Sequence, residues 1–402
     1  MTATTKGFDI MPAVRLFFVG FLATFVLTGL AMVAPERFFP EASATGGGLR
    51  LIRDRYEIAI YYDRSEWVAS GALPYTAASH QEYPPLGALY IALPRFFTDD
   101  ILVFEAISLA RSAVCFGLLF AVTGTLLRRF GRPRSLLLFF FMPAFLYFSL
   151  WRYDTFPALF VSLAVLAVDA EFYGAAIVAL WAGIAAKIYP VFFFLPLFQR
   201  LERHGGEKKV RASVAKGLIV VLTLSAAFLL AAKALGLSPV AMVLGTHAHR
   251  PFEVGSVREL LLRWLWKLGM HPEVAKGLIG VSFGLLQFGA FLPLVNRAKV
   301  RDSRTFVRAC LYLLIPFTAF GWFFSQQWII WIAPLLILVA APKELLMLAV
   351  LDILLFLQFP VLYDVDFRAP AFDAVTIART FVLCWLWWAN AKALSRGSRE
   401  AK

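Results

Sequence analysis

Five carboxylates lie in one polar segment that separates two long apolar runs of the sequence. The segment extends from Arg50 to Pro85, and its acidic residues are Asp54, Glu57, Asp63, Glu66 and Glu82. A polar loop of this kind, in a chain that is otherwise mostly apolar, is a usual place for chemistry. One carboxylate can take the proton of an attacking hydroxyl group while cations stabilise a leaving phosphate. Because the phosphate is a weak base, such a transfer needs no second, acidic carboxyl group.

The spacing of these residues predicts how they are positioned. Residues 49–70 contain no proline and predict a helix. On a helix, Asp54, Glu57 and Tyr61 share one face because they are three and four residues apart. Asp63 lies on a different face of this helix from Glu57.

Positively charged candidates lie farther along the chain. They are Lys187, His247, His249 and Arg250. Such side chains bind phosphate through charge-assisted hydrogen bonds. The two histidines with Glu253 have no identifiable fourth ligand, so a structural metal is not expected. A divalent cation that bridges a phosphate and a carboxylate stays open.

Three motifs in the polar segment resemble the first outer loop of membrane glycosyltransferases with the GT-C fold. They are Glu57-x-x-x-Tyr61, Gly71-Ala72-Leu73-Pro74-Tyr75 and Glu82-Tyr83-Pro84-Pro85. The resemblance is closest to bacterial mannosyltransferase-like members that use polyprenyl-phosphate sugars. In that family the acidic residue four positions before the tyrosine is usually Asp. This chain has Glu57 there, which keeps Asp54 and Asp63 as alternatives.

Shorter matches follow along most of the chain. They are Arg152-Tyr153-Asp154, Lys187-Ile188-Tyr189-Pro190, His247-x-His249-Arg250-Pro251 with Glu253 and Ser256, and Ser325-Gln326-Gln327-Trp328. Family members often carry a lysine a few residues before this serine, where the chain has Trp322. A contact to the donor phosphate at that position is therefore not expected.

The resemblance implies inverting transfer of a sugar, mannose or arabinose, from a polyprenyl-phosphate donor to a glycolipid or glycan acceptor. It makes Glu57 the base. The residues that it assigns to the donor phosphate are Lys187, Arg250, His249 and His247. The residues that it assigns to shaping the site are Tyr61, Tyr75, Glu82, Tyr83, Arg152, Asp154, Glu253 and Ser325.

Simpler interpretations compete with these roles. Glu57 and Asp63 could form ion pairs with neighbouring arginines on an exposed helix. Lys187 could extend to the membrane interface from a helix end. Arg152 and Asp154 could be a structural pair that caps a helix, and this is the interpretation that we favour for them, since both charges are supplied locally.

The composition requires a membrane. Apolar residues make up 60% of the chain, and its mean hydropathy is +0.73; a water-soluble surface cannot be built from such a sequence. We predict one all-α, GT-C-like membrane domain over residues 1–402 with about ten to twelve transmembrane helices. The apolar segments are 13–34, 101–125, 135–150, 155–169, 173–187, 189–199, 215–234, 273–294, 305–322, 328–341, 344–362 and 374–391.

The basic residues predict the orientation of these segments. Arginines and lysines gather in alternate loops and in the tail 392–402, whereas the loops 35–100, 235–272 and 363–373 lie on the other side. The positive-inside rule makes the basic side cytoplasmic, with both termini there. The candidate catalytic loop, 35–100, then faces outward from a bacterial cytoplasmic membrane.

Other functions suit parts of the sequence. A secondary transporter or a flippase for lipid-linked sugars fits the composition equally well. A transporter would carry acidic residues at mid-membrane, and here only Asp154 and Asp352 approach that position. Nucleic acid is not expected as a partner despite the net charge of +13, because the basic residues are spread over helix ends, where they contact membrane lipids.

Overall fold

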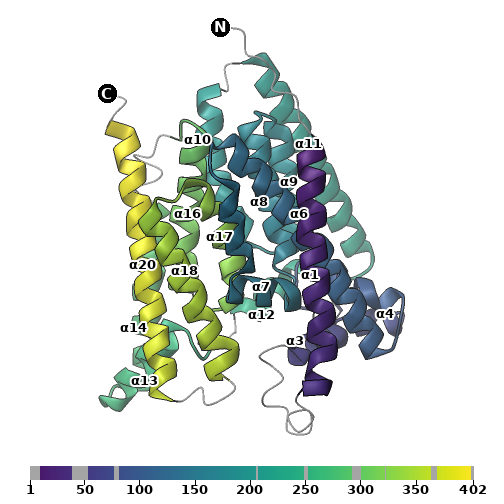
Figure 1. Cartoon of the computed structure of the whole chain (residues 1–402), viewed down its shortest axis with the longest axis vertical. Coiled ribbons are helices and arrows are strands. Elements are labelled where there is room, and N and C mark those ends of the chain that lie inside the picture. Colours follow the sequence, from purple (N-terminus) through teal and green to yellow (C-terminus); the bar gives the residue numbers. More distant parts are fainter. Residues whose placement is uncertain are drawn as a thin grey trace.

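The computed structural model describes residues 10–38, 53–76, 81–204, 207–248, 252–291, 300–321, 323–363 and 369–399. Over these residues the chain forms helices and no β-strand, which confirms the predicted all-α fold class. The longer helices run roughly along the long axis of an elongated bundle (Figure 1).

Five of the described helices are long and apolar enough to cross a membrane. They are α1 (Ile10–Phe38), α6 (Ile101–Arg129), α11 (Lys208–Ala234), α18 (Pro342–Phe356) with its continuation η6 (Leu357–Leu362), and α20 (Pro370–Arg399). The pair η3 (Arg134–Phe141) and α7 (Pro143–Trp151) is apolar enough as well when the two helices are taken together, but it is bent by 66°, as in a broken span or a re-entrant loop. The chain is therefore an integral membrane protein.

Each predicted apolar segment overlaps a helix, but several of these helices are short. The remaining members of the bundle are α8 (Thr155–Asp169), α9 (Tyr173–Ala186), η4 (Tyr189–Phe193), α10 (Phe194–His204), α14 (Pro272–Gly289), α16 (Ser303–Ala319), η5 (Gln326–Trp328) and α17 (Ile329–Val339). α17 is buried along almost its whole length and packs against α7, α8 and α16. The length and apolar composition of single helices or bent pairs thus account for five or six of the ten to twelve predicted spans.

The bend before α7 has a local cause. Pro143 is the first residue of α7, and the carboxylate of Asp352 on α18 accepts hydrogen bonds from the backbone N–H groups of Ala144 and Phe145, at 2.9 and 2.8 Å. A carboxylate at a helix N-terminus satisfies N–H groups that have no partner within the helix. Asp352, one of the two acids predicted to lie nearest to mid-membrane, is thus engaged as a helix cap.

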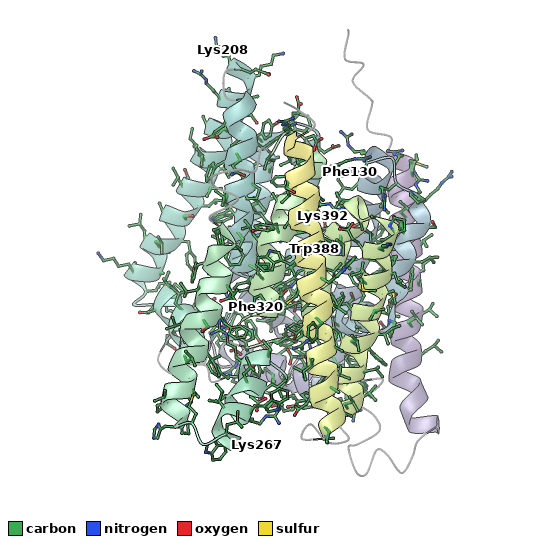
Figure 2. All side chains as sticks on the ribbon, turned by 90° about the vertical axis from the view of Figure 1, so that its left-hand side faces the viewer. Phe130, Lys208, Lys267, Phe320, Trp388 and Lys392 are labelled. Carbon is green, nitrogen blue, oxygen red and sulfur yellow. The ribbon has the colours of Figure 1, made fainter. Side chains whose placement is uncertain are left out.

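The two ends of the bundle differ. Figure 2 places Phe130, Lys208 and Lys392 toward one end and Lys267 at the other. The first three belong to loops or helix ends that were predicted to share the basic side. We call their end the basic end and the opposite one the loop end.

Arginines cap helix C-termini at the basic end. Arg304 donates a hydrogen bond to the carbonyl of Phe130, and Arg132 donates one to the carbonyl of Ala340 at 2.6 Å. Phe130 and Ala340 are the residues that follow α6 and α17. The last carbonyls of a helix lack partners within it, so these arginines satisfy groups that would otherwise be open.

The segments 35–100 and 235–272, which were predicted to face outward and are called the first and second outer loops below, form short helices at the loop end. These are α3 (Arg55–Arg64), α4 (Glu66–Ala69), α5 (Pro85–Ala92), η2 (Leu93–Phe96), α12 (Pro239–Ala248) and α13 (Val257–Lys267). The prediction of a single helix over 49–70 is therefore wrong, because the helix is interrupted at Ser65, between α3 and α4. Residues 49–52 lie outside the described part of the chain. Gly71 follows the end of α4 and has a φ of +66°, the left-handed conformation that glycine adopts after a helix.

Candidate functional site

An ion-pair cluster joins the first outer loop to the membrane bundle. Arg152, which follows α7, binds two carboxylates: its Nη2 lies 2.8 Å from Asp54, and its Nη1 pairs with Glu57. Asp54 is fully buried and caps α3 by accepting a hydrogen bond from the Glu57 N–H, whereas the Glu57 side chain is 13% exposed. Asp54 and Glu57 thus face the same way, as their spacing predicted.

A second cluster surrounds Asp154. Its Oδ1 accepts hydrogen bonds from Lys187 Nζ at 2.7 Å and from Trp331 Nε1 at 2.6 Å. Asp154 is fully buried, and its Oδ2 has no hydrogen-bond partner among the described residues. The structural pairing of Arg152 with Asp154 that we favoured is therefore wrong, because each of the two binds residues from distant segments instead.

Lys187 is positioned by the end of α9. The helix ends at Ala186, and Lys187 has extended backbone angles (φ −162°, ψ 136°) before η4 begins at Tyr189. Its Nζ lies 4.6 Å from the ring centroid of Tyr153 and 5.1 Å from that of Trp331, distances typical of cation–π contacts. The side chain thus points into the Asp154 cluster, and its exposure is 19%.

Helix α5 approaches this turn closely. A Cβ at Gly87 would lie 2.4 Å from the carbonyl oxygen of Ala186, the residue before Lys187. Only glycine allows the two backbones to come so near. The Pro84-Pro85 turn, at which α5 begins, therefore brings the returning outer loop against the segment that carries Lys187.

We expect Gly87→Ala to lower the free energy of unfolding by about 1–3 kcal/mol, because an extra carbon is forced into a packed contact. Thermal unfolding in detergent measures the effect. Gly29→Ala on α1 is the matched control, since nothing lies within 4 Å of a Cβ there and alanine favours a helix. Equal unfolding midpoints for the two variants would contradict the close approach.

Three tyrosine rings link the two clusters. Tyr61, Tyr83 and Tyr153 contact one another edge to face, with centroid distances of 6.2, 6.1 and 5.3 Å. Burial raises the pKa of Tyr61 well above its ordinary value of 10.0, so its hydroxyl stays protonated. The Tyr75 hydroxyl donates to the carbonyl of Tyr83 at 2.7 Å. Tyr61 therefore does not supply a base, and the contacts of these tyrosines hold the outer loop in place.

A cavity of about 480 Å³ opens beside Glu82. The described residues that line it are Arg64, Glu82, Ala241, Met242, Gly245 and Thr246. The Glu82 carboxylate lies 3.7 Å from Arg64 Nη2, and the Glu82 side chain is 12% exposed. Both outer loops thus contribute to one cavity that carries a carboxylate and a guanidinium group.

Several predicted site residues lie apart from the clusters or cannot be placed. Asp63 is exposed on α3, and Glu253 is exposed after α12. Ser325 is half-buried at the start of η5. His249 and Arg250 lie outside the described residues. Two of the four predicted phosphate ligands therefore have no described position.

His247 is connected to Lys187 by a row of aromatic rings. The His247 ring stacks on Phe323 with a centroid distance of 6.0 Å, Phe323 contacts Trp328 at 5.3 Å, and Trp328 stacks on Trp331 at 5.1 Å. Trp331 lies beside Lys187. The structure therefore places the first histidine of the second outer loop along one aromatic row with the Asp154 cluster.

Two interactions were not predicted from the sequence: the ion pair between Arg53 and Glu105, and the hydrogen bond from Trp331 to Asp154. Arg53 Nε and Nη2 bind both carboxylate oxygens of Glu105 at 2.6 and 2.5 Å, and both side chains are buried. The signal was available, because a carboxylate within an apolar segment is rarely without a partner. Trp331 gave no such signal, since an indole N–H in an aromatic-rich span has many possible partners.

The described residues hold no group of three His, Cys, Asp or Glu side chains arranged as a metal site. The site instead contains two ion pairs. In one, the partly exposed carboxylate of Glu57 pairs with Arg152; in the other, the partly exposed ammonium group of Lys187 pairs with the buried carboxylate of Asp154. Comparison with known proteins finds no protein-family model that matches the chain and no curated protein that matches it.

Proposed function

We propose that the chain is an inverting, GT-C-like glycosyltransferase that uses a polyprenyl-phosphate sugar. The observation that carries the proposal is the convergence of Glu57, Arg152, Asp154 and Lys187 at the loop end. These charges come from the first outer loop, the turn between α7 and α8, and the end of α9. In such a transfer, negative charge develops on the leaving phosphate. Charged side chains that are held in fixed positions stabilise this charge.

Glu57 is the proposed base. A base must reach the acceptor hydroxyl, and the Glu57 carboxylate is partly exposed whereas Asp54 is fully buried as a helix cap. Arg152 binds Glu57 and so fixes the position of its carboxylate. Asp63 and Asp54 are the second choices.

Lys187 is the proposed contact of the donor phosphate, together with His247, His249 and Arg250. Its ammonium group is partly exposed and is held by Asp154, so its position is set before a donor binds. Preorganised cations stabilise a leaving phosphate without further rearrangement. The aromatic row that ends beside Lys187 suits an apolar polyprenyl chain.

We expect Lys187→Met to raise the KM for the donor at least about tenfold, because a charge-assisted hydrogen bond contributes about 1.5–3 kcal/mol. Lys187→Arg keeps the charge for Asp154 and is the matched control; it should retain folding and part of the donor affinity. Initial rates at varied donor concentration measure the effect. An unchanged KM in the methionine variant would remove Lys187 from the donor site.

The cavity beside Glu82 is the proposed acceptor site. Carboxylate and guanidinium groups form charge-assisted hydrogen bonds with sugar hydroxyls. A volume of about 480 Å³ lies within the range of small-molecule sites. A glycolipid or glycan acceptor at this position would lie next to Tyr83 and the tyrosine rings that lead to Glu57.

The proposed orientation follows the distribution of basic residues. The positive-inside rule assigns the basic end to the cytoplasm and the loop end to the outer face of a bacterial cytoplasmic membrane. The site then faces outward, where polyprenyl-linked sugars are used for extracellular glycans.

The direct test is transfer of radiolabelled sugar from a panel of polyprenyl-phosphate sugars by the purified protein, with a membrane lipid extract as acceptor. Product that depends on Glu57 supports the proposal, and the productive donor identifies the sugar as mannose, arabinose or another. Donor lipid that binds without product would support a flippase. Neither product nor binding would favour a secondary transporter.

A further inference from the structure

A second cavity opens far from the charge clusters, in the half of the bundle near the basic end. It has a volume of about 800 Å³ and lies between α8, α9 and α11. Its lining is apolar except toward the basic end, where Arg129, Ser213 and Lys216 contribute. The cavity is therefore an apolar groove with polar and cationic groups at one end.

The groove is fixed by close packing of α11 on α9. A Cβ at Gly174 would lie 2.2 Å from the carbonyl oxygen of Ser213, and one at Gly217 would lie 2.6 Å from that of Gly174. The Gly174 N–H also donates to Ser213 Oγ at 3.1 Å. Nearer the loop end, Trp181 Nε1 donates to the Oγ of Ser225 at 3.0 Å. These contacts hold α11 against α9, and the groove remains between α11 and α8.

The floor of the groove is built from small side chains. Ala175, Ala179 and Ala182 follow one another on one face of α9 and line the cavity. At this depth in a membrane, water would leave its hydrogen bonds unsatisfied against an apolar wall. A smooth apolar groove of this kind fits an extended hydrocarbon chain.

The charged groups at the basic end of the groove favour an anionic ligand group. The guanidinium of Arg129 is held at the groove by Asp169, to which its Nε donates. Lys216 is exposed, and no ion pair to it is found among the described residues. A phosphate beside Lys216 and Ser213 would therefore meet one uncompensated cation and one hydroxyl group.

We propose that this groove binds an anionic phospholipid of the leaflet at the basic end. One acyl chain lies on the alanine floor of α9, and the phosphate lies at Lys216 and Ser213. The lipid fills the space between α11 and α8 and so holds α11 in its place beside the bundle. The site is separate from the proposed transfer reaction and does not depend on it.

Lipid retention by the full-length protein tests the proposal. The protein is reconstituted in nanodiscs of equal parts phosphatidylglycerol and phosphatidylcholine, extracted into detergent and examined by native mass spectrometry. We expect retained phosphatidylglycerol to exceed phosphatidylcholine. Lys216→Glu should lower this ratio at least about fivefold, because removing one lysine near an anionic lipid already has that effect and the glutamate adds repulsion. Ala175→Phe, which fills the groove, should lower retention of both lipids.

Lys209→Glu is the matched control, because Lys209 is exposed on the same helix but does not line the groove. It makes the same change in net charge and should retain lipid as the unmodified protein does. An equal loss in Lys209→Glu and Lys216→Glu would overturn the headgroup site. Full retention in a folded Ala175→Phe variant would overturn the groove as the site, and selective retention of a polyprenyl lipid from a membrane extract would overturn the proposed occupant.

Discussion

The Glu57→Gln variant is expected to lose sugar transfer by a factor of about 10²–10⁴, which is the usual contribution of a general base. Glutamine keeps the size of the side chain, and its carbonyl oxygen still accepts a hydrogen bond from Arg152, but it cannot take a proton from the acceptor. The variant should therefore insert and fold normally. Initial transfer rates with the productive donor measure the loss, and circular dichroism with size-exclusion chromatography checks folding.

Asp63→Asn is the matched control for Glu57→Gln. Asp63 lies on the same helix, α3, but is exposed and belongs to neither ion-pair cluster. It should transfer sugar at nearly the normal rate. Near-normal turnover of Glu57→Gln together with loss in Asp63→Asn would show that Glu57 is not the base.

Arg53→Met is expected to lower the free energy of unfolding by about 3–5 kcal/mol, because it leaves a buried carboxylate without its counter-charge. That carboxylate is Glu105 of α6, whose side chain is 3% exposed. Arg53 directly precedes Asp54, so the variant should also weaken the connection of the outer loop to the bundle. Thermal unfolding in detergent measures the loss.

The double variant Arg53→Met with Glu105→Leu should recover most of this stability, since two apolar side chains can replace a buried ion pair. Arg55→Met serves as a control on the same segment, because Arg55 is exposed. If Arg53→Met destabilised the protein no more than Arg55→Met does, the ion pair would not be what holds the outer loop to α6.

The parts of the site that follow local rules could be predicted from the sequence. Apolar runs located the helices, and the spacing of three between Asp54 and Glu57 placed both on one side of α3. Partners that are distant in sequence could not be predicted in this way. Arg152 binds Asp54 across 98 positions, and Asp154 binds Trp331 across 177. Local pairing therefore favoured Arg152 with Asp154, and tertiary packing gave each a different partner.

The break in the outer-loop helix shows a second limit. The helix is interrupted at a serine, Ser65, and not at a glycine or proline. The composition of 49–70 therefore predicted one continuous helix. In the structure the Ser65 Oγ donates to the carbonyl of Tyr62 at 2.7 Å, and Ser65 is fully buried between α3 and α4. A serine that competes for backbone hydrogen bonds can end a helix, but the same residue is tolerated in many helices.

The arginines that cap α6 and α17 have a role both in membrane insertion and in the folded protein. During insertion, the positive charges of Arg132 and Arg304 belong to the signal that sets which way the helices cross. After folding, the same guanidinium groups close the ends of two helices. Lysine in their place would preserve the insertion signal but lose the planar geometry of the cap. Biogenesis and the finished fold thus constrain the same positions for different reasons.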